Sequence, residues 1–482
     1  MISALCLDNN IPVRQNPCRD RHGSRNYMNK LISLILLILT AAPAGAGPAL
    51  ERLTAEPKDF TTAVTPVPGA APAKEWTLMI FMNGKSNIEP FALGDFNRFE
   101  TVGSSEKINI VVELGRSKGL DNDTAADGDW AGVRRYFVTR DNDKEHISSP
   151  LLADLGNADM GDWKEAAAFL KWARAAYPAK KYMFMIWDHG WGWIDPKKPG
   201  DNLVDGQKSI SHDFVTGNYI GTTQMGKIFK EAGKVDLYGA MACFMQMAET
   251  AYELKDAADV LVASEEVIQL PSLNFEDFFA LLEKNPSAGA GQAGIYLVDT
   301  FKEMYSRPEY QQMLEETKYG TQLSAIRAAK LPLLAKKTAR WAGLTMAAGD
   351  KEALTRAKTG VLRFEVGDET TDPDKQLSFY GDLYNFVELA GRYSDKSRPG
   401  AKEAAAAGED LNRFIAGELT IKNVWLGRDR TGKEYAAAHG MGINIPGKPG
   451  SLIEYYPTYS RLAFEKASGW SKFMTYLESV AN

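Results

Sequence analysis

The chain has few of the features that mark disulfide-rich, metal-binding or membrane-spanning proteins. Its 482 residues include only three cysteines and five histidines. We find no internal repeat, no phosphate-binding glycine loop and no zinc-ligand spacing. The apolar run at residues 31–40 is far shorter than the about 20 residues that a membrane span needs. These shortages argue against a disulfide scaffold, a solenoid, a zinc protein and an integral membrane protein.

The first 46 residues end in the pattern of a secretory signal peptide. Met28-Asn29-Lys30 precedes the apolar residues 31–40, and Ala44-Gly45-Ala46 follows as a small-residue cleavage site. We therefore predict export, either to a periplasm or out of the cell. Residues 1–27 are what a start codon assigned too far upstream would add. Residues 47–74, rich in proline and alanine toward their end, are predicted to be a linker.

Removal of residues 1–46 would leave an acidic chain with a single cysteine. The segment takes five of the 56 Lys and Arg and two of the 62 Asp and Glu, which leaves 51 against 60, a formal charge of −9. An acidic chain without a basic patch argues against nucleic acid as a partner. Cys6 and Cys18 would leave with the segment, so Cys243 could form no disulfide within the mature chain. A reactive role or inert burial would explain such a thiol.

Apolar runs alternate with amphipathic stretches in the first half of the mature chain. We expect strands at 76–82, 108–114, 133–139, 182–187, 235–240 and 260–263, and helices at 91–99, 162–177 and 223–232. Apolar runs separated by helices at this spacing predict an α/β fold with a mostly parallel sheet covered on both faces.

The second half is predicted to be mainly helical. We expect helices at 275–282, 293–304, 321–347, 377–390, 402–419 and 469–477, and strands at 423–427 and 440–446. The chain would then have a core at residues 75–285. A helical region at 286–482 would pack on that core and return one or two strands to its sheet.

Two of the predicted strands run into residues that could carry chemistry. The strand at 182–187 leads to His189, and the strand at 235–240 leads to Cys243. Because the carboxyl ends of parallel strands gather at one edge of a sheet, we predict that the two residues form one site. Histidine is the usual side chain that generates the thiolate needed to attack a carbonyl. The backbone N–H groups of Gly190 and Cys243 are predicted to hold the developing oxyanion.

Five blocks of the sequence match the pattern of a known family. They are residues 183–192 around the histidine, 239–249 around the cysteine, 262–265, 382–386 and 440–446. With these blocks the chain resembles the clostripain family of cysteine peptidases, within the caspase-like clan. The histidine lies 54 residues before the cysteine, close to the caspase spacing of about 50. The resemblance implies a caspase-like αβα sandwich and an endopeptidase with a His189/Cys243 dyad, acting on peptide or protein substrates without a required cofactor.

The position two residues before the cysteine departs from the family pattern. The family usually has an aspartate there, which shapes a pocket for Arg or Lys before the cleaved bond, whereas this chain has Met241. Ser264, Glu265 and Glu266 follow the next strand and are predicted to line this pocket, where the two glutamates would supply the missing charge. The alternative is an apolar pocket that accepts a different residue.

The polar stretch at 194–221 carries two weaker hypotheses. His212 is accompanied there by Asp201, Asp205 and Asp213. Oxygen ligands on a flexible loop suit Ca²⁺, but the twelve-residue calcium-loop spacing is absent, and a solvated surface loop is the alternative. The stretch also contains Lys197, Lys198 and Lys208, and the resemblance suggests it as a place of self-cleavage.

Two further functional classes stay open. A chain that keeps the fold without activity would be a binding or scaffold protein, and Met241 favours this reading. The same dyad would also support a cysteine-dependent amidase or transpeptidase. Asp188 either orients His189 or is an ordinary acidic turn residue, and His146, in a charged stretch, is predicted to be exposed.

Overall fold

The computed structural model describes residues 73–120, 122–193, 209–364, 380–429, 431–446 and 456–480. All of these residues belong to one unit of the chain. The predicted signal peptide and nearly all of the predicted linker lie outside the described residues. Within the described ranges, no helix combines the length and the apolar character that crossing a membrane requires.

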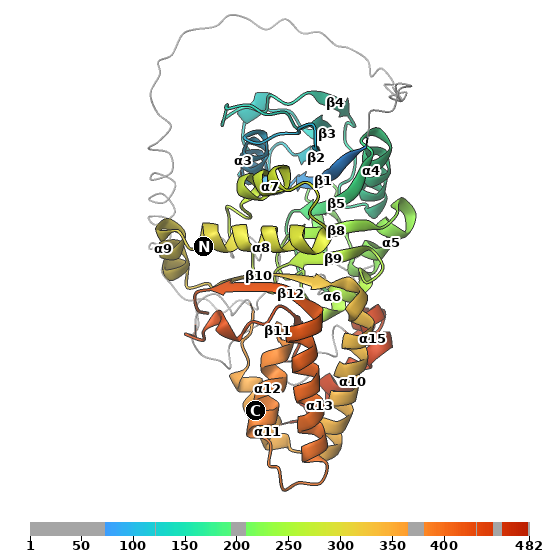
Figure 1. Ribbon diagram of the computed structural model, residues 1–482, viewed down its shortest axis with the longest axis vertical. Helices are drawn as coiled ribbons and strands as arrows, with labels where there is room; N and C mark the ends of the chain where they lie inside the picture. Colours follow the sequence, from blue (N-terminus) through green and yellow to red (C-terminus); the bar gives the residue numbers. More distant parts are fainter. Residues whose placement is uncertain are drawn as a thin grey trace, which may run out of the picture. The chain divides into compact units, whose positions relative to one another are not determined.

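A nine-stranded sheet forms the centre of this unit (Figure 1). Five neighbouring strands are parallel: β9 (Ala258–Ala263), β8 (Val235–Met241), β5 (Ala179–Trp187), β1 (Lys74–Gly84) and β2 (Ile108–Arg116). Antiparallel strands extend both edges: β10 (Thr321–Arg327) and β12 (Thr420–Leu426) beside β9, and β3 (Gly132–Phe137) and β4 (Leu151–Asp154) beside β2. The predicted α/β fold with a parallel central sheet is confirmed.

Helices cover both faces of the sheet, because successive side chains of a strand point to opposite sides. In β1, Phe81 belongs to one apolar core and its neighbour Ile80 belongs to the other. The first core contains residues of α4 (Trp163–Ala176), α5 (Thr222–Ala232) and α6 (Ala248–Glu253); the second contains residues of α3 (Glu89–Glu100), α7 (Phe275–Lys284), α8 (Ala290–Tyr305) and α9 (Pro308–Thr317). The result is the αβα sandwich that the sequence predicted.

The predicted helix at 321–347 was wrong in its first third. Residues Thr321–Arg327 form β10, which lies between β9 and β12, and helix α10 (Leu331–Ala348) begins only after a 3₁₀ turn. Every residue of β10 except Arg327 is buried. Pairing with β9 and β12 satisfies the backbone hydrogen bonds of this short segment of mixed polarity. The tertiary contacts therefore determined its structure, although the local sequence pattern favours a helix.

Two other segments near the carboxyl end differ from the prediction. The helix expected at 377–390 begins at Leu383 as α12 (Leu383–Tyr393), and β11 (Tyr380–Asp382) precedes it. Strand β11 pairs with β13 (Gly442–Asn444) in a separate two-stranded sheet. Of the two strands expected near the carboxyl end, β12 therefore joins the central sheet and β13 does not. A second small sheet pairs β6 (Ile210–Asp213) with β7 (Asn218–Ile220), where a loop was expected.

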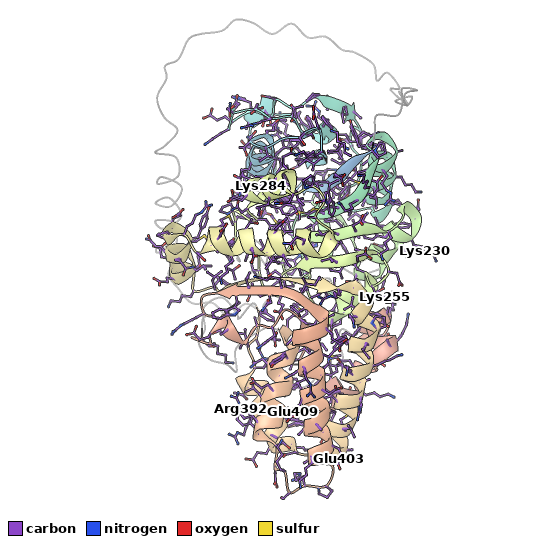
Figure 2. The ribbon with its side chains drawn as sticks, in the orientation of Figure 1. Lys230, Lys255, Lys284, Arg392, Glu403 and Glu409 are labelled. Carbon is purple, nitrogen blue, oxygen red and sulfur yellow. The ribbon has the colours of Figure 1, made fainter. Side chains whose placement is uncertain are left out.

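A helical part lies beyond β12 (Figure 1). It contains α10, α11 (Lys351–Gly360), α12, α13 (Ala401–Phe414), α15 (Ala463–Ser468) and α16 (Trp470–Glu478). The ring of Trp341 packs against Phe386 at 5.8 Å and Phe473 at 5.2 Å between centroids. Some charged side chains of the helices are exposed, among them Lys230 of α5, Lys284 of α7 and Glu403 of α13 (Figure 2).

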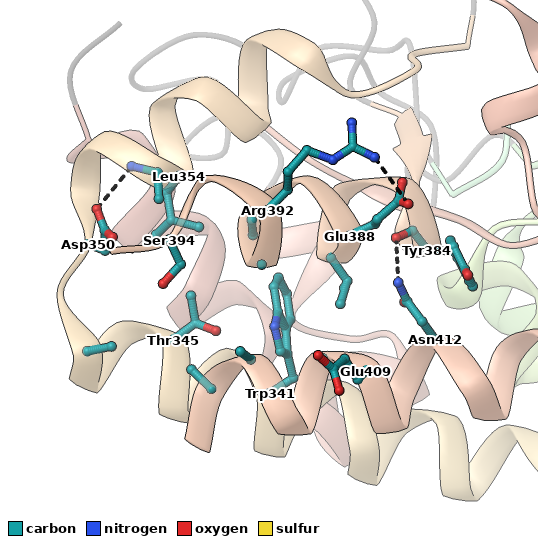
Figure 3. Close-up of a pocket in the computed structure, with 18 of the residues that line it drawn as sticks. Trp341, Thr345, Asp350, Leu354, Tyr384, Glu388, Arg392, Ser394, Glu409 and Asn412 are labelled. Atoms are coloured by element: carbon teal, nitrogen blue, oxygen red, sulfur yellow. Dashed lines mark hydrogen bonds and ion pairs between the residues drawn. The ribbon is translucent and has the colours of Figure 1, made fainter. Parts of the chain in front are cut away.

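A groove of about 870 Å³ runs between α10, α11, α12 and α13 (Figure 3). Small residues such as Gly408 line its walls, beside Trp341. An exposed ion pair joins Glu388 and Arg392 at 3.2 Å on its rim. None of the site residues predicted from the sequence lines this groove.

Candidate active site

The pairing of β5 with β8 brings the two predicted dyad residues to one edge of the sheet. Trp187 pairs with Met241 in the parallel register, and the N–H of Asp188 donates to the carbonyl oxygen of Met241 at 3.2 Å. His189 lies two residues beyond Trp187, and Cys243 lies two residues beyond Met241. Both residues are 4 % exposed.

Gly190 lies directly against Cys243. A Cβ atom at Gly190 would stand 2.4 Å from the carbonyl oxygen of Cys243 and 3.0 Å from its nitrogen. Real Cβ atoms do not approach other atoms this closely, so only glycine fits here without displacing the backbone of Cys243. The backbones that carry the two predicted oxyanion donors are thus in contact.

A buried amide contacts the histidine ring. Nε2 of His189 lies 2.7 Å from Oδ1 of Asn87, and the ring stacks on Phe214 with 5.9 Å between centroids and 11° between planes. Sequence reasoning missed Asn87. The available signal was its place in the polar turn after β1, at the same edge of the sheet as His189.

Asp188 holds the turn after β1. Its carboxylate accepts hydrogen bonds from Asn83 Nδ2 at 3.1 Å, from Ser86 Oγ at 3.4 Å and from the N–H of His212. Burial raises the pKa of the Asp188 carboxyl well above its usual range, against the opposing effect of the N–H donors. The hydrogen bonds that Asp188 accepts from Asn83 and Ser86 hold in place the segment that presents Asn87.

The segment after Cys243 turns sharply and is held by the end of β9. Phe244 has a φ of 59°, in the left-handed region that few residues other than glycine adopt. Its N–H donates to the carbonyl of Glu266 at 3.3 Å, and the N–H of Gln246 donates to the carbonyl of Ser264 at 2.9 Å. These bonds fix the turn that carries the thiol.

The residues predicted to line the substrate pocket are all buried. Ser264 Oγ accepts from the N–H of Glu266 at 3.0 Å, and Met241 packs in the apolar core that also contains Trp187 and Ile268. Glu266 accepts hydrogen bonds from the N–H of Val267 at 2.7 Å and from the hydroxyl of Tyr435. The Glu266 carboxylate is therefore already bonded within the protein.

Glu265 lies in a cluster that sequence reasoning did not assemble. Its carboxylate accepts from the N–H of Gly440 at 2.9 Å, and burial, followed by the nearby carboxylate of Asp382, raises its pKa well above its usual range. His439 Nδ1 lies 3.6 Å from Asp382, and its ring stacks on Tyr384 at 3.8 Å. Burial lowers the pKa of His439, but the hydrogen bond and the charge of Asp382, with smaller contributions from the Ala437 carbonyl and Glu388, together outweigh it, and the net direction is upward.

The blocks 382–386 and 440–446, which only the family resemblance singled out, therefore contact the end of β9 and the cysteine turn. The N–H of Gly442 donates to the carbonyl of Gln246 at 3.0 Å. Glu249 of α6 accepts from the N–H of Asn444 and the hydroxyl of Tyr459, both at 2.9 Å. Burial raises the pKa of Glu249 to about 7.

The expectation that His212 lies on a solvated loop was wrong. His212 is 5 % exposed in β6, and Asp213 forms a buried ion pair with Lys85 at 2.5 Å. Within the described residues, no group of three or more His, Cys, Asp or Glu could hold a metal ion. Asp201, Asp205, Lys197, Lys198 and Lys208 lie outside the described residues, so the calcium and self-cleavage hypotheses stay predictions. His146 is exposed, as expected, and bonds to Asp143 at 3.1 Å.

Comparisons with known proteins identify a family for the chain. The sequence model of the clostripain family matches residues 80–478. Clostripain from Hathewaya histolytica is 25% identical over 218 residues, a match that covers 42% of this chain and only 41% of that protein.

Two solved structures show the same fold. A secreted C11 cysteine protease from Bacteroides thetaiotaomicron, bound to an irreversible peptide inhibitor, aligns with a TM-score of 0.56 and 17% identity over 82% of this chain and 99% of that chain. An inactive zymogen C11 protease from Parabacteroides distasonis aligns with a TM-score of 0.56 and 13% identity over 83% and 99%.

Proposed function

We propose that this chain, which belongs to the clostripain family, is a cysteine endopeptidase in which Cys243 is the nucleophile and His189 transfers the proton. The observation that carries this proposal is the parallel register of β5 and β8. It places both residues two positions beyond paired strand ends and sets Gly190 against Cys243.

The reaction would follow from these positions. His189 takes the proton of the Cys243 thiol, and the thiolate attacks the carbonyl carbon of the peptide bond. The N–H groups of Gly190 and Cys243 donate to the resulting oxyanion. The histidine turn also contacts the residue that precedes β6. In this contact the donor is the N–H of Trp191, not that of Gly190, and it donates to the carbonyl of Ser209 at 2.9 Å. The imidazolium then protonates the leaving amine, and water hydrolyses the acyl-enzyme.

Thiol reactivity tests the proposal directly. A thiol activated by His189 is expected to react with iodoacetamide near neutral pH faster than a model thiol does, because the imidazole accepts the proton that the sulfur loses. Labelling of Cys243 in the folded protein is measured by mass spectrometry of the peptide that contains it. The His189→Ala variant, as the matched control, is expected to label at least about tenfold more slowly.

The low exposure of Cys243 makes this test demanding. A sulfur sealed within the core would label only after denaturation, and that result would contradict the proposal. Equal labelling rates in the parent and in His189→Ala would contradict the assignment of His189.

We further propose that the residue before the cleaved bond is uncharged. Met241 supplies no charge, Glu266 is bonded to Tyr435, and the raised pKa of Glu265 favours its neutral form. A cationic side chain that enters a site whose carboxylates are neutral or already bonded within the protein loses its hydration with little return.

A peptide library that varies the residue before the cut is expected to show kcat/KM at least about tenfold higher for Met or Leu than for Arg or Lys. The Met241→Asp variant would narrow this ratio, and Met241→Leu, which keeps the apolar side chain, would leave it unchanged. A parent enzyme that prefers Arg or Lys would contradict the proposal.

Export of the protein is part of the same proposal. The signal-peptide pattern that ends at Ala46 supports it, and the Bacteroides thetaiotaomicron protease of the same fold is described as secreted.

A further inference from the structure

The side chain of Asn87 touches the imidazole of His189 from the turn after β1. The contact is buried, with 2.7 Å between Asn87 Oδ1 and His189 Nε2. A carboxamide oxygen accepts hydrogen bonds and cannot donate them. Nε2 therefore carries a proton in this contact, and in the neutral imidazole the lone pair is on Nδ1.

We propose that Asn87 is a positioning residue for this chemistry, an inference that rests on the proposed function. By holding a proton on Nε2, Asn87 makes Nδ1 the nitrogen that accepts the proton of the Cys243 thiol. Proton transfer from sulfur to Nδ1 gives a thiolate and an imidazolium, and Nδ1–H later returns this proton to the leaving amine. Nε2–H stays bonded to Asn87 throughout.

The turn that carries Asn87 is held firmly enough for this role. Ser86, its neighbour, donates to the buried carboxylate of Asp188 at 3.4 Å. Lys85 forms a buried ion pair with Asp213 at 2.5 Å and donates to the carbonyl of Ala158 at 2.9 Å. A ring between the Asn87 oxygen and the face of Phe214 has little freedom to rotate. Groups that are held in this way keep a catalytic side chain in its productive orientation.

The neutral amide also sets the pH range of the reaction. A carboxylate at the same position would stabilise the imidazolium and raise the pKa of His189, because an opposite charge within hydrogen-bonding distance favours the charged form. Asparagine fixes the tautomer without this effect. The isosteric change Asn87→Asp therefore alters charge while it keeps an oxygen acceptor in place.

Asn87→Ala and Asn87→Asp variants test the inference. Asn87→Ala is expected to lower kcat at least about tenfold while KM changes less than about threefold, because tautomer and ring orientation are lost while substrate contacts remain. Asn87→Asp is expected to retain more activity than Asn87→Ala. Its alkaline limb of the kcat/KM profile should move upward by about one pH unit or more, since the imidazolium persists to higher pH.

Asn122→Ala is the matched control. Asn122 Nδ2 donates to the backbone carbonyl of Asn87 at 3.3 Å, so its removal affects the same turn but not the side-chain contact. It should leave both the pH profile and kcat near the parent values. A fall in kcat equal to that of Asn87→Ala would show a structural effect only and overturn the inference.

The failure of this inference can be told apart from the failure of the proposed function. If the parent cleaves peptides through Cys243 but Asn87→Ala keeps full kcat, or Asn87→Asp keeps the parent pH profile, Asn87 has no positioning role. If Asn87→Ala does not fold, the pH profile of Asn87→Asp alone decides. A parent with no peptidase activity and an inert Cys243 overturns both.

Discussion

Replacement of Cys243 with alanine is expected to lower kcat for peptide cleavage by about 10⁴-fold or more, because loss of the nucleophile removes the covalent route. The geometry supports a large effect. The turn at Phe244 and the bond to Glu266 hold the backbone of Cys243 next to Gly190, at the end of β8 and beside the strand that leads to His189. Steady-state cleavage of a peptide that the parent accepts measures the loss.

The design requires a variant that keeps the fold. Alanine is smaller than cysteine and adds no polar group, so the thermal midpoint of Cys243→Ala should stay close to that of the parent. His189→Ala belongs in the same series, and the double variant should be little worse than either single one, because the two residues act as a unit. A Cys243→Ala protein that keeps a tenth of the parent kcat would mean that another group is the nucleophile.

Removal of Arg116 is expected to cost about 3–5 kcal/mol of unfolding free energy. Arg116 and Glu89 are both 0% exposed, and Arg116 donates to Glu89 Oε1 from Nε at 2.9 Å and from Nη2 at 2.7 Å. Burial raises the pKa of the Glu89 carboxyl although Arg116 opposes this shift. In Arg116→Ala the Glu89 carboxylate would be buried without its partner, and urea unfolding measures the loss.

Two comparisons sharpen this experiment. Arg392→Ala removes an exposed partner of Glu388 and should cost less than about 1 kcal/mol. A double variant with Glu89→Leu and Arg116→Met replaces the pair by apolar groups of similar volume and should regain most of the stability. If Arg116→Ala loses less than about 1 kcal/mol, water or rearrangement satisfies Glu89, and the pair does not hold the start of α3.

The five parallel strands of the central sheet could be predicted because each contains a mostly apolar run, whereas β4 and β10 were not expected as strands. Strands β2, β5 and β8 each contain a mostly apolar, buried run, as parallel strands covered on both faces do. Charged residues occur at Glu113 in β2, Lys180 and Lys181 in β5, and Asp236 in β8. Strand β10 lacked this pattern because its sequence, Thr-Gln-Leu-Ser-Ala-Ile-Arg, mixes polar and apolar residues, which neighbouring strands and helix α8 bury. Its structure depends on contacts that local sequence does not contain.

The same limit applies to the candidate site. His189 and Cys243 could be placed because each follows a recognisable strand, whereas the contact between His189 and Asn87 joins residues 102 positions apart. Glu265 was predicted as a source of charge for the pocket. Its state depends instead on burial and on Asp382, which lies far along the chain. Spacing along a sequence reveals which residues share an edge, but not which of them pair across it.

The register of β5 and β8 has a consequence for which amino-acid substitutions this protein tolerates. The separation between the two reactive turns is set by main-chain hydrogen bonds, which almost any amino acid can make. Substitutions within the strands can therefore accumulate without moving the turns apart. Gly190 is exempt from this tolerance, since even one added methyl group would push into the backbone of Cys243. A library of single substitutions scored for peptide cleavage would show buried strands that accept apolar replacements. The strands would lead to invariant positions at His189, Gly190 and Cys243.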